Sequence, residues 1–174
     1  MQLVMKGSIR LVWPALLLAA IPAHAQDCPA ALRAEARDAS GVVYQFWPVR
    51  LANEVQDLVM ASPAAPDQIR RVTYGGSREA GCHFQALAMA HGGDWGWHLA
   101  WSSARGVFYA RMDGAAWVSS PPKRFSRNSA KQIEFSLDGP LQLRWQEEGA
   151  AETRSVSSED EGRNWSEPLA LPGN

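Results

Sequence analysis

The residues best suited to chemistry in this chain are two histidines and an aspartate near its middle. His91 and His98 are seven residues apart, and Asp94 lies between them next to Gly92-Gly93. The paired glycines predict a hairpin, which would bring the two imidazoles near each other across its strands. A zinc site needs three or four ligands, and no third ligand is evident in this pattern. We therefore expect surface histidines here and predict no metal site and no cofactor.

Tryptophans flank the turn of the same hairpin. Trp95 and Trp97 stand on either side of Gly96. A tryptophan at a turn tip is harder to explain by core packing than one in mid-strand, and an exposed indole can stack on a sugar or on a partner's side chain. Packing against a neighbouring element is the open alternative. The candidate ligand-binding residues are Trp95, Trp97, His98 and Arg144.

A third group of polar side chains stands near the C-terminus, in the spacing S-x-D-x-G-x-x-W. Its four fixed positions are Ser158, Asp160, Gly162 and Trp165. A hydroxyl and a carboxylate two residues apart can bond the backbone N–H groups of a tight turn. Glycine accepts the positive φ that such a turn requires. The indole can fold back over the turn as an apolar plug.

This motif resembles the Asp-box, or BNR, repeat of sialidase-like β-propellers at all four positions. A second, degenerate copy keeps only the glycine and the tryptophan, at Gly114 and Trp117, because methionine and alanine occupy the Asp and Ser positions. The resemblance covers about half of the chain. It implies that the four motif residues are structural and remote from any active site. A calcium site at Asp160 with Glu159 and Glu161 is the alternative, but the spacing does not match an EF-hand loop.

The resemblance also raises the question of glycosidase chemistry. Sialidases of this fold use an arginine cluster for the substrate carboxylate, a Tyr/Glu nucleophile pair and an acidic proton carrier. The arginines are scattered here, and the chain is too short for the blades of a full sialidase. We assign no catalytic residue and favour a protein that is not an enzyme. The scattered arginines are Arg78, Arg105, Arg144 and Arg154.

The first 25 residues predict a secretory signal peptide. Lys6 and Arg10 form a basic start, Leu11 to Ile21 an apolar stretch, and Ala23 to Ala25 a cleavage site. The apolar stretch is too short for a transmembrane helix, and none follows it. We therefore expect a periplasmic or secreted protein that is not embedded in the membrane after cleavage. The remaining chain, 26–174, predicts a single β domain.

Two cysteines, Cys28 and Cys82, remain after the predicted cleavage. In an exported chain the expected fate of such a pair is a disulfide bond. The net charge is close to zero, at −1 for the full chain, and no basic stripe appears. A nucleic-acid partner is therefore not expected.

Turn signals and apolar runs divide the domain into strands. The composition of 29–37 favours a short helical lead-in after Pro29. Segment 48–62 is open between helix and strand. Its apolar residues recur at helical spacing, but 57–62 looks like an internal copy of 98–103.

A pattern of strands and turns recurs along the chain with the length of a four-stranded propeller blade. We place repeats at 84–125 and 131–171 and a possible first repeat at 41–80. The predicted fold class is mainly β, with two to three antiparallel propeller-like blades, partial or completed by oligomerisation. Isolated blades leave exposed sheet edges, so a homo-oligomer is one possible outcome.

Three classes of function remain. We favour an exported, non-catalytic binding module whose ligand is a carbohydrate or a periplasmic protein. The alternatives are a sialidase-like glycoside hydrolase and an accessory subunit that completes a partner's β-sheet.

Overall fold

The computed structural model describes residues 28–74, 76–78 and 80–171. The predicted signal peptide lies outside these residues. The described part of the chain forms β-strands and no helix, so it contains no helix able to span a membrane. The strands are β1 Ala34–Arg37, β2 Val43–Arg50, β3 Gln56–Ala61, β4 Arg70–Arg71, β5 Phe84–Gly92, β6 Gly96–Ser103, β7 Gly106–Asp113, β8 Lys123–Ser126, β9 Ala130–Ser136, β10 Leu141–Glu147, β11 Thr153–Ser158 and β12 Leu169–Leu171.

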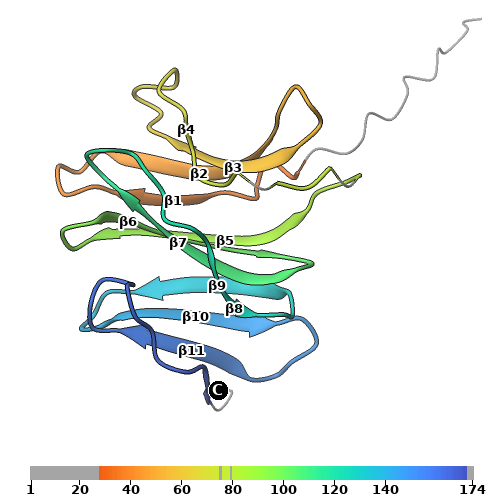
Figure 1. The fold of residues 1–174 in the computed structure, drawn as a ribbon, viewed down its shortest axis with the longest axis vertical. Helices are drawn as coiled ribbons and strands as arrows, with labels where there is room; N and C mark the ends of the chain where they lie inside the picture. Colours follow the sequence, from red (N-terminus) through yellow and green to blue (C-terminus); the bar gives the residue numbers. More distant parts are fainter. Residues whose placement is uncertain (1–27, 75, 79, 172–174) are drawn as a thin grey trace, which may run out of the picture.

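These strands form three four-stranded antiparallel sheets, each made of consecutive strands. We call β1–β4 the first sheet, β5–β8 the second and β9–β12 the third. The sheets lie one after another, with the second between the other two (Figure 1). The first strands of the sheets are neighbours, because β5 contacts both β1 and β9. The mainly β, propeller-like fold class predicted from the sequence is confirmed.

Two hydrophobic cores hold the sheets together. The core between the first and second sheets contains Phe46, Leu58, Met60, Val72, Phe84, Met89, Trp97, Leu99, Trp101, Ala110 and Met112. The core between the second and third sheets contains Ala88, Ala100, Val107, Tyr109, Ala130, Leu143, Trp145 and Val156. Successive residues of a strand point to opposite faces, so β6 and β7 supply apolar side chains to both cores. The second sheet is therefore covered on both faces.

The outer face of the third sheet is polar. Along β10, the buried residues Leu141, Leu143 and Trp145 alternate with half-buried polar ones. Those polar residues are Gln142, Arg144 and Gln146. A homo-oligomer stays a prediction, and this polar face counts against one that stacks a further blade on the third sheet.

The helix predicted over 29–37 is wrong, because β1 occupies 34–37. Ala34 and Ala36 pack against the first core, whereas Glu35 and Arg37 are exposed. This two-residue alternation pairs β1 with β2 in register. Pairing and burial override the helix propensity of Ala, Arg and Glu, which is a weak preference. The first sheet thus spans 34–71, whereas the possible first repeat was placed at 41–80.

Segment 48–62 consists of strand, turn and strand. β2 continues through Pro48 to Arg50, and a turn with Glu54 at φ 63° leads into β3. Pro48 fits within β2 because β1 pairs only as far as Phe46, so no partner strand requires an N–H from the proline on that side. The strand alternative for this segment was correct. The resemblance of 57–62 to 98–103, however, assigned the strand to the wrong position in its sheet. β3 is the third strand of its sheet, and β6 is the second.

The structure contains the predicted disulfide between Cys28 and Cys82. It joins the segment before β1 to the segment before β5, and both cysteines pack against the first core. The bond therefore fixes the start of the described chain to the boundary between the first and second sheets.

The segment between β7 and β8 connects the first two sheets. It runs from the second sheet to the first and back (Figure 1). Trp117, at φ 57°, contacts Tyr44 of β2 with ring centroids 5.6 Å apart. The Arg70 guanidinium lies 5.4 Å from the Trp117 ring centroid. The tryptophan of the degenerate repeat thus packs on the preceding sheet.

Candidate functional site

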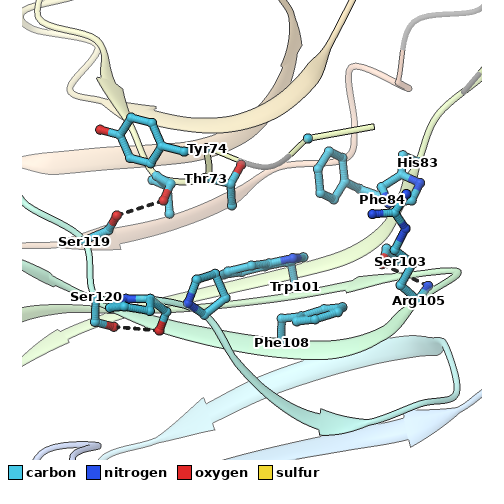
Figure 2. Close-up of a pocket in the computed structure, with 14 residues that line it drawn as sticks. Thr73, Tyr74, His83, Phe84, Trp101, Ser103, Arg105, Phe108, Ser119 and Ser120 are labelled. Atoms are coloured by element: carbon cyan, nitrogen blue, oxygen red, sulfur yellow. Dashed lines mark hydrogen bonds between the residues drawn. The ribbon is translucent and has the colours of Figure 1, made fainter. Parts of the chain in front are cut away.

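A cleft of about 450 Å³ opens between the first and second sheets (Figure 2). Most of its lining side chains are aromatic, proline or small hydroxyl residues. The lining residues are Val72, Thr73, Tyr74, Gly76, His83, Phe84, Trp101, Ser103, Arg105, Phe108, Ser119, Ser120, Pro121 and Pro122. None of these is acidic.

The second sheet supplies the aromatic floor of this cleft. Trp101 of β6 and Phe108 of β7 are direct cross-strand partners. Their rings stack with centroids 5.8 Å apart and planes 14° apart. Such cross-strand aromatic pairs stabilise the sheet. Figure 2 shows these two rings lying on one side of the cleft, with Thr73 and Tyr74 opposite them.

The segment after β4 supplies the opposite wall. The Val72 N–H donates to the Leu58 carbonyl at 2.8 Å, which holds the segment on β3. The Thr73 hydroxyl donates to the buried Asp57 carboxylate at 2.7 Å. Tyr74 is 72% exposed, and the Arg71 guanidinium lies 4.8 Å from its ring centroid. This wall therefore presents an accessible aromatic ring on a backbone that is firmly held.

The small hydroxyl groups of the cleft already make hydrogen bonds within the protein. Ser119 donates to the Val72 carbonyl at 2.9 Å. Ser120 accepts from the Arg111 N–H at 3.0 Å, and Ser103 accepts from the Arg105 N–H at 3.1 Å. Hydroxyls engaged in this way have less capacity to bond a ligand. The cleft consequently offers mainly apolar surface.

The predicted ligand-binding residues do not meet in one place. Trp97 and His98 are only 1% and 2% exposed, and each contributes to the wall of a different cleft. Trp97 belongs to the first core. Trp95 is half-buried, with the guanidinium groups of Arg111 and Arg163 at 4.3 and 5.5 Å from its ring centroid. These contacts agree with the alternative that Trp95 packs against neighbouring side chains of the protein.

Arg144 lies in a different, polar cleft at the first strands of the second and third sheets. Its side chain donates to Gln142 Oε1 at 2.9 Å and is 40% exposed. Of the four predicted binding residues, Arg144 is therefore the one that lines a cleft with a substantially exposed side chain.

The motif at 158–165 forms a hydrogen-bonded turn after β11. The Ser158 hydroxyl accepts from the Gly162 N–H at 2.8 Å and donates to Asp160 Oδ1 at 2.9 Å. Asp160 Oδ1 accepts from the Asn164 N–H at 2.8 Å. Hydrogen bonds from the backbone and side chain of Asn164 lower the pKa of Asp160 to about 2. The carboxylate is therefore ionised, and its acceptors are used within the turn.

The same turn docks on the second sheet. The Asp94 N–H donates to Glu161 Oε1 at 2.9 Å. The Trp165 ring meets the Tyr109 ring at a centroid distance of 4.8 Å, and the Trp165 indole N–H donates to the Gly162 carbonyl at 3.0 Å. At φ 80°, Gly162 lies against the Tyr109 hydroxyl, where a Cβ atom would be 1.9 Å from the oxygen. Both tryptophans of the repeat pattern, Trp117 and Trp165, thus pack on the preceding sheet.

Replacing Ser158 with alanine should lower the free energy of unfolding by about 1–3 kcal/mol, because the buried Gly162 N–H loses its acceptor. Chemical denaturation of the variant measures the loss. Ser157→Ala is the matched control, since the Ser157 hydroxyl makes no hydrogen bond among the described residues. Ligand binding by folded Ser158→Ala protein should persist. An unchanged stability with lost binding would instead give the turn a direct role in function.

The described residues contain no group of three or more His, Cys, Asp or Glu with the geometry to hold a metal ion. His98 Nδ1 lies 2.8 Å from the Tyr109 hydroxyl in the interior between the second and third sheets. Burial lowers the pKa of His98 to about 4 and raises the pKa of Tyr109. The imidazole is therefore neutral at physiological pH.

Comparisons with known proteins show no family. No family model matches the chain, and no curated protein is similar to it. One similar solved structure is an alpha-L-arabinofuranosidase from Podospora anserina in complex with cellotriose, with a TM-score of 0.42 and 9% sequence identity. The match covers 82% of this chain and 57% of that one. A similarity of this size carries no inference about the activity of this protein.

Sequence reasoning missed the aromatic residues of the cleft. Trp101 and Phe108 face each other across one hairpin, but Tyr74 comes from a distant segment that no local spacing links to them. Two features of the sequence could have pointed to this cleft. They are the high tryptophan content and the Pro121-Pro122 pair, which follows Trp117 of the degenerate repeat. Only the packing of the first sheet on the second brings these residues to one cleft.

Proposed function

We propose that this protein is an exported, non-catalytic binding module that holds an apolar segment of a partner protein in the cleft between its first two sheets. The observation that carries the proposal is the lining of the cleft, which is aromatic and proline-rich and whose serine and threonine hydroxyls are bonded internally. Apolar side chains gain free energy from burial in such a site, without needing new polar partners.

The rim of the cleft supports a protein ligand. Tyr74 lines the cleft and is 72% exposed. Exposed apolar side chains grouped around a groove are typical of protein interaction sites. Tyrosine is also among the residues that contribute most strongly to binding at interfaces.

The other functions considered from the sequence receive less support at this cleft. Glycoside hydrolysis generally uses a pair of carboxyl groups, and none of the lining residues is acidic. A carbohydrate ligand would stack on the aromatic rings, but it would also require free hydrogen-bonding groups. An accessory subunit that extends a partner's sheet would pair through an outer strand. The last strands of the three sheets, β4, β8 and β12, contain only two, four and three residues.

Selection of a random-peptide library on the folded protein tests this proposal. We expect selected peptides to be rich in apolar residues, and Tyr74→Ala to weaken their binding about tenfold or more. Leu169→Ala is the control, because Leu169 is 62% exposed but belongs to β12 of the third sheet. The failure of every peptide to bind, or binding that survives Tyr74→Ala unchanged, would contradict the proposal. Binding on a glycan array that depends on Tyr74 would reassign the cleft to carbohydrate.

A further inference from the structure

A second cleft, of about 440 Å³, lies where the first strands of the second and third sheets meet the segment before β1. Its walls are polar, in contrast to the apolar cleft described above. The long polar and charged residues lining it are Arg33, Gln85, Lys131, Gln132, Glu134, Arg144 and Gln146. They come from four separate parts of the chain: the segment before β1, and strands β5, β9 and β10.

Cations outnumber carboxylates around this cleft. Arg33, Lys131 and Arg144 face a single acidic lining residue, Glu134. The Glu134 carboxylate is 4.0 Å from Arg144 Nη1, which is long for an ion pair, and both side chains are partly exposed. An exposed pair of this kind neutralises little of the charge. The cleft therefore keeps a positive potential.

The cationic groups also have hydrogen-bonding capacity to spare. Arg144 Nε is buried and has no hydrogen-bond partner among the described residues. Lys131 is exposed and makes no hydrogen bond or ion pair within the described part of the chain. An unpaired, buried guanidinium N–H is unfavourable, and an oxyanion supplied by a ligand would satisfy it.

We propose that this cleft binds the oxyanion group, a carboxylate or a phosphate, of a small polar ligand. Guanidinium and ammonium groups form their strongest hydrogen bonds with such oxyanions. Arg144 and Lys131 hold the anionic group, and Arg33, whose Nη1 donates to Gln45 Oε1 at 2.8 Å, adds to the positive potential. The amides of Gln85 and Gln132 supply hydrogen-bonding groups for neutral hydroxyl or carbonyl groups of the same ligand, whereas the Gln146 amide nitrogen already donates to the Ala150 and Ala151 carbonyls.

Isothermal titration calorimetry on the mature protein tests this proposal. The probes are glucuronate, which carries a carboxylate, inorganic phosphate and neutral glucose. We expect saturable binding of glucuronate or of phosphate, weaker at high salt because screening reduces charge attraction. Glucose should show none. The anion that binds identifies which of the two oxyanions the site takes, and the absence of saturable binding by both would overturn the proposal.

Charge-removing variants locate the binding. Lys131→Gln and Arg144→Gln should each raise the dissociation constant about tenfold, the loss expected for one charge-assisted hydrogen bond. Arg124→Gln is the matched control, because it removes the same charge from an exposed position in β8. If Arg124→Gln weakened anion binding equally, the effect would come from net charge alone and the proposed site would be wrong. Tyr74→Ala should leave anion binding unchanged, so failure of this proposal and failure of the apolar cleft are distinguishable.

Discussion

Replacing Cys28 and Cys82 together with alanine should lower the free energy of unfolding by about 4 kcal/mol. The disulfide closes a loop with a sequence separation of 54, and the loss of that constraint enlarges the conformational freedom of the unfolded chain. Denaturant unfolding of wild type and double variant under non-oxidising, non-reducing conditions measures the difference. The effect is large compared with the total stability of most domains.

Two controls separate the disulfide from its surroundings. Thiol counting on unfolded, non-reduced wild-type protein made in an oxidising compartment should find no free thiol. Reduction of the wild type should reproduce the stability loss of the double variant, since both remove the same bond. Two free thiols in the wild type, or an unfolding midpoint unaffected by the substitutions, would contradict the prediction.

Acidification from pH 6.5 to pH 4 should lower the free energy of unfolding by about 3 kcal/mol through His98 alone. Burial lowers the pKa of His98 to about 4 in the folded protein, whereas an unfolded histidine titrates near 6.5. In this range the unfolded chain binds the proton and the folded one does not. The stabilisation is therefore complete above pH 6.5 and is lost as the pH falls through this range.

His98→Gln tests this assignment. Glutamine can still hydrogen-bond the Tyr109 hydroxyl but does not titrate. Denaturant unfolding at several pH values between 4 and 7 should show a flatter dependence for the variant than for wild type. The charged groups that act on the imidazole, Glu161, Arg111 and His91, are present in both proteins, so their own contributions cancel in the comparison. Parallel pH curves would exclude His98 as the source.

The sequence alone determined the properties that depend on local patterns. Alternating apolar residues and turn signals predicted strands in the second and third sheets, because side chains on a strand alternate between faces. The pair of cysteines in a chain with a predicted export signal predicted the disulfide seen between Cys28 and Cys82. The S-x-D-x-G-x-x-W spacing predicted a turn, since Ser158 and Asp160 bond backbone groups only two to four residues away.

Only the tertiary structure decided which residues became accessible and which met. Residues 34–37 form a strand because β2 offers an edge to pair with, and no local preference encodes that edge. Trp97 and His98 follow an exposed hairpin tip in sequence, yet both are buried because the second sheet is covered on both faces. Tyr74, Trp101 and Phe108 share a cleft because two sheets pack together, a contact between distant segments that residue spacing does not record.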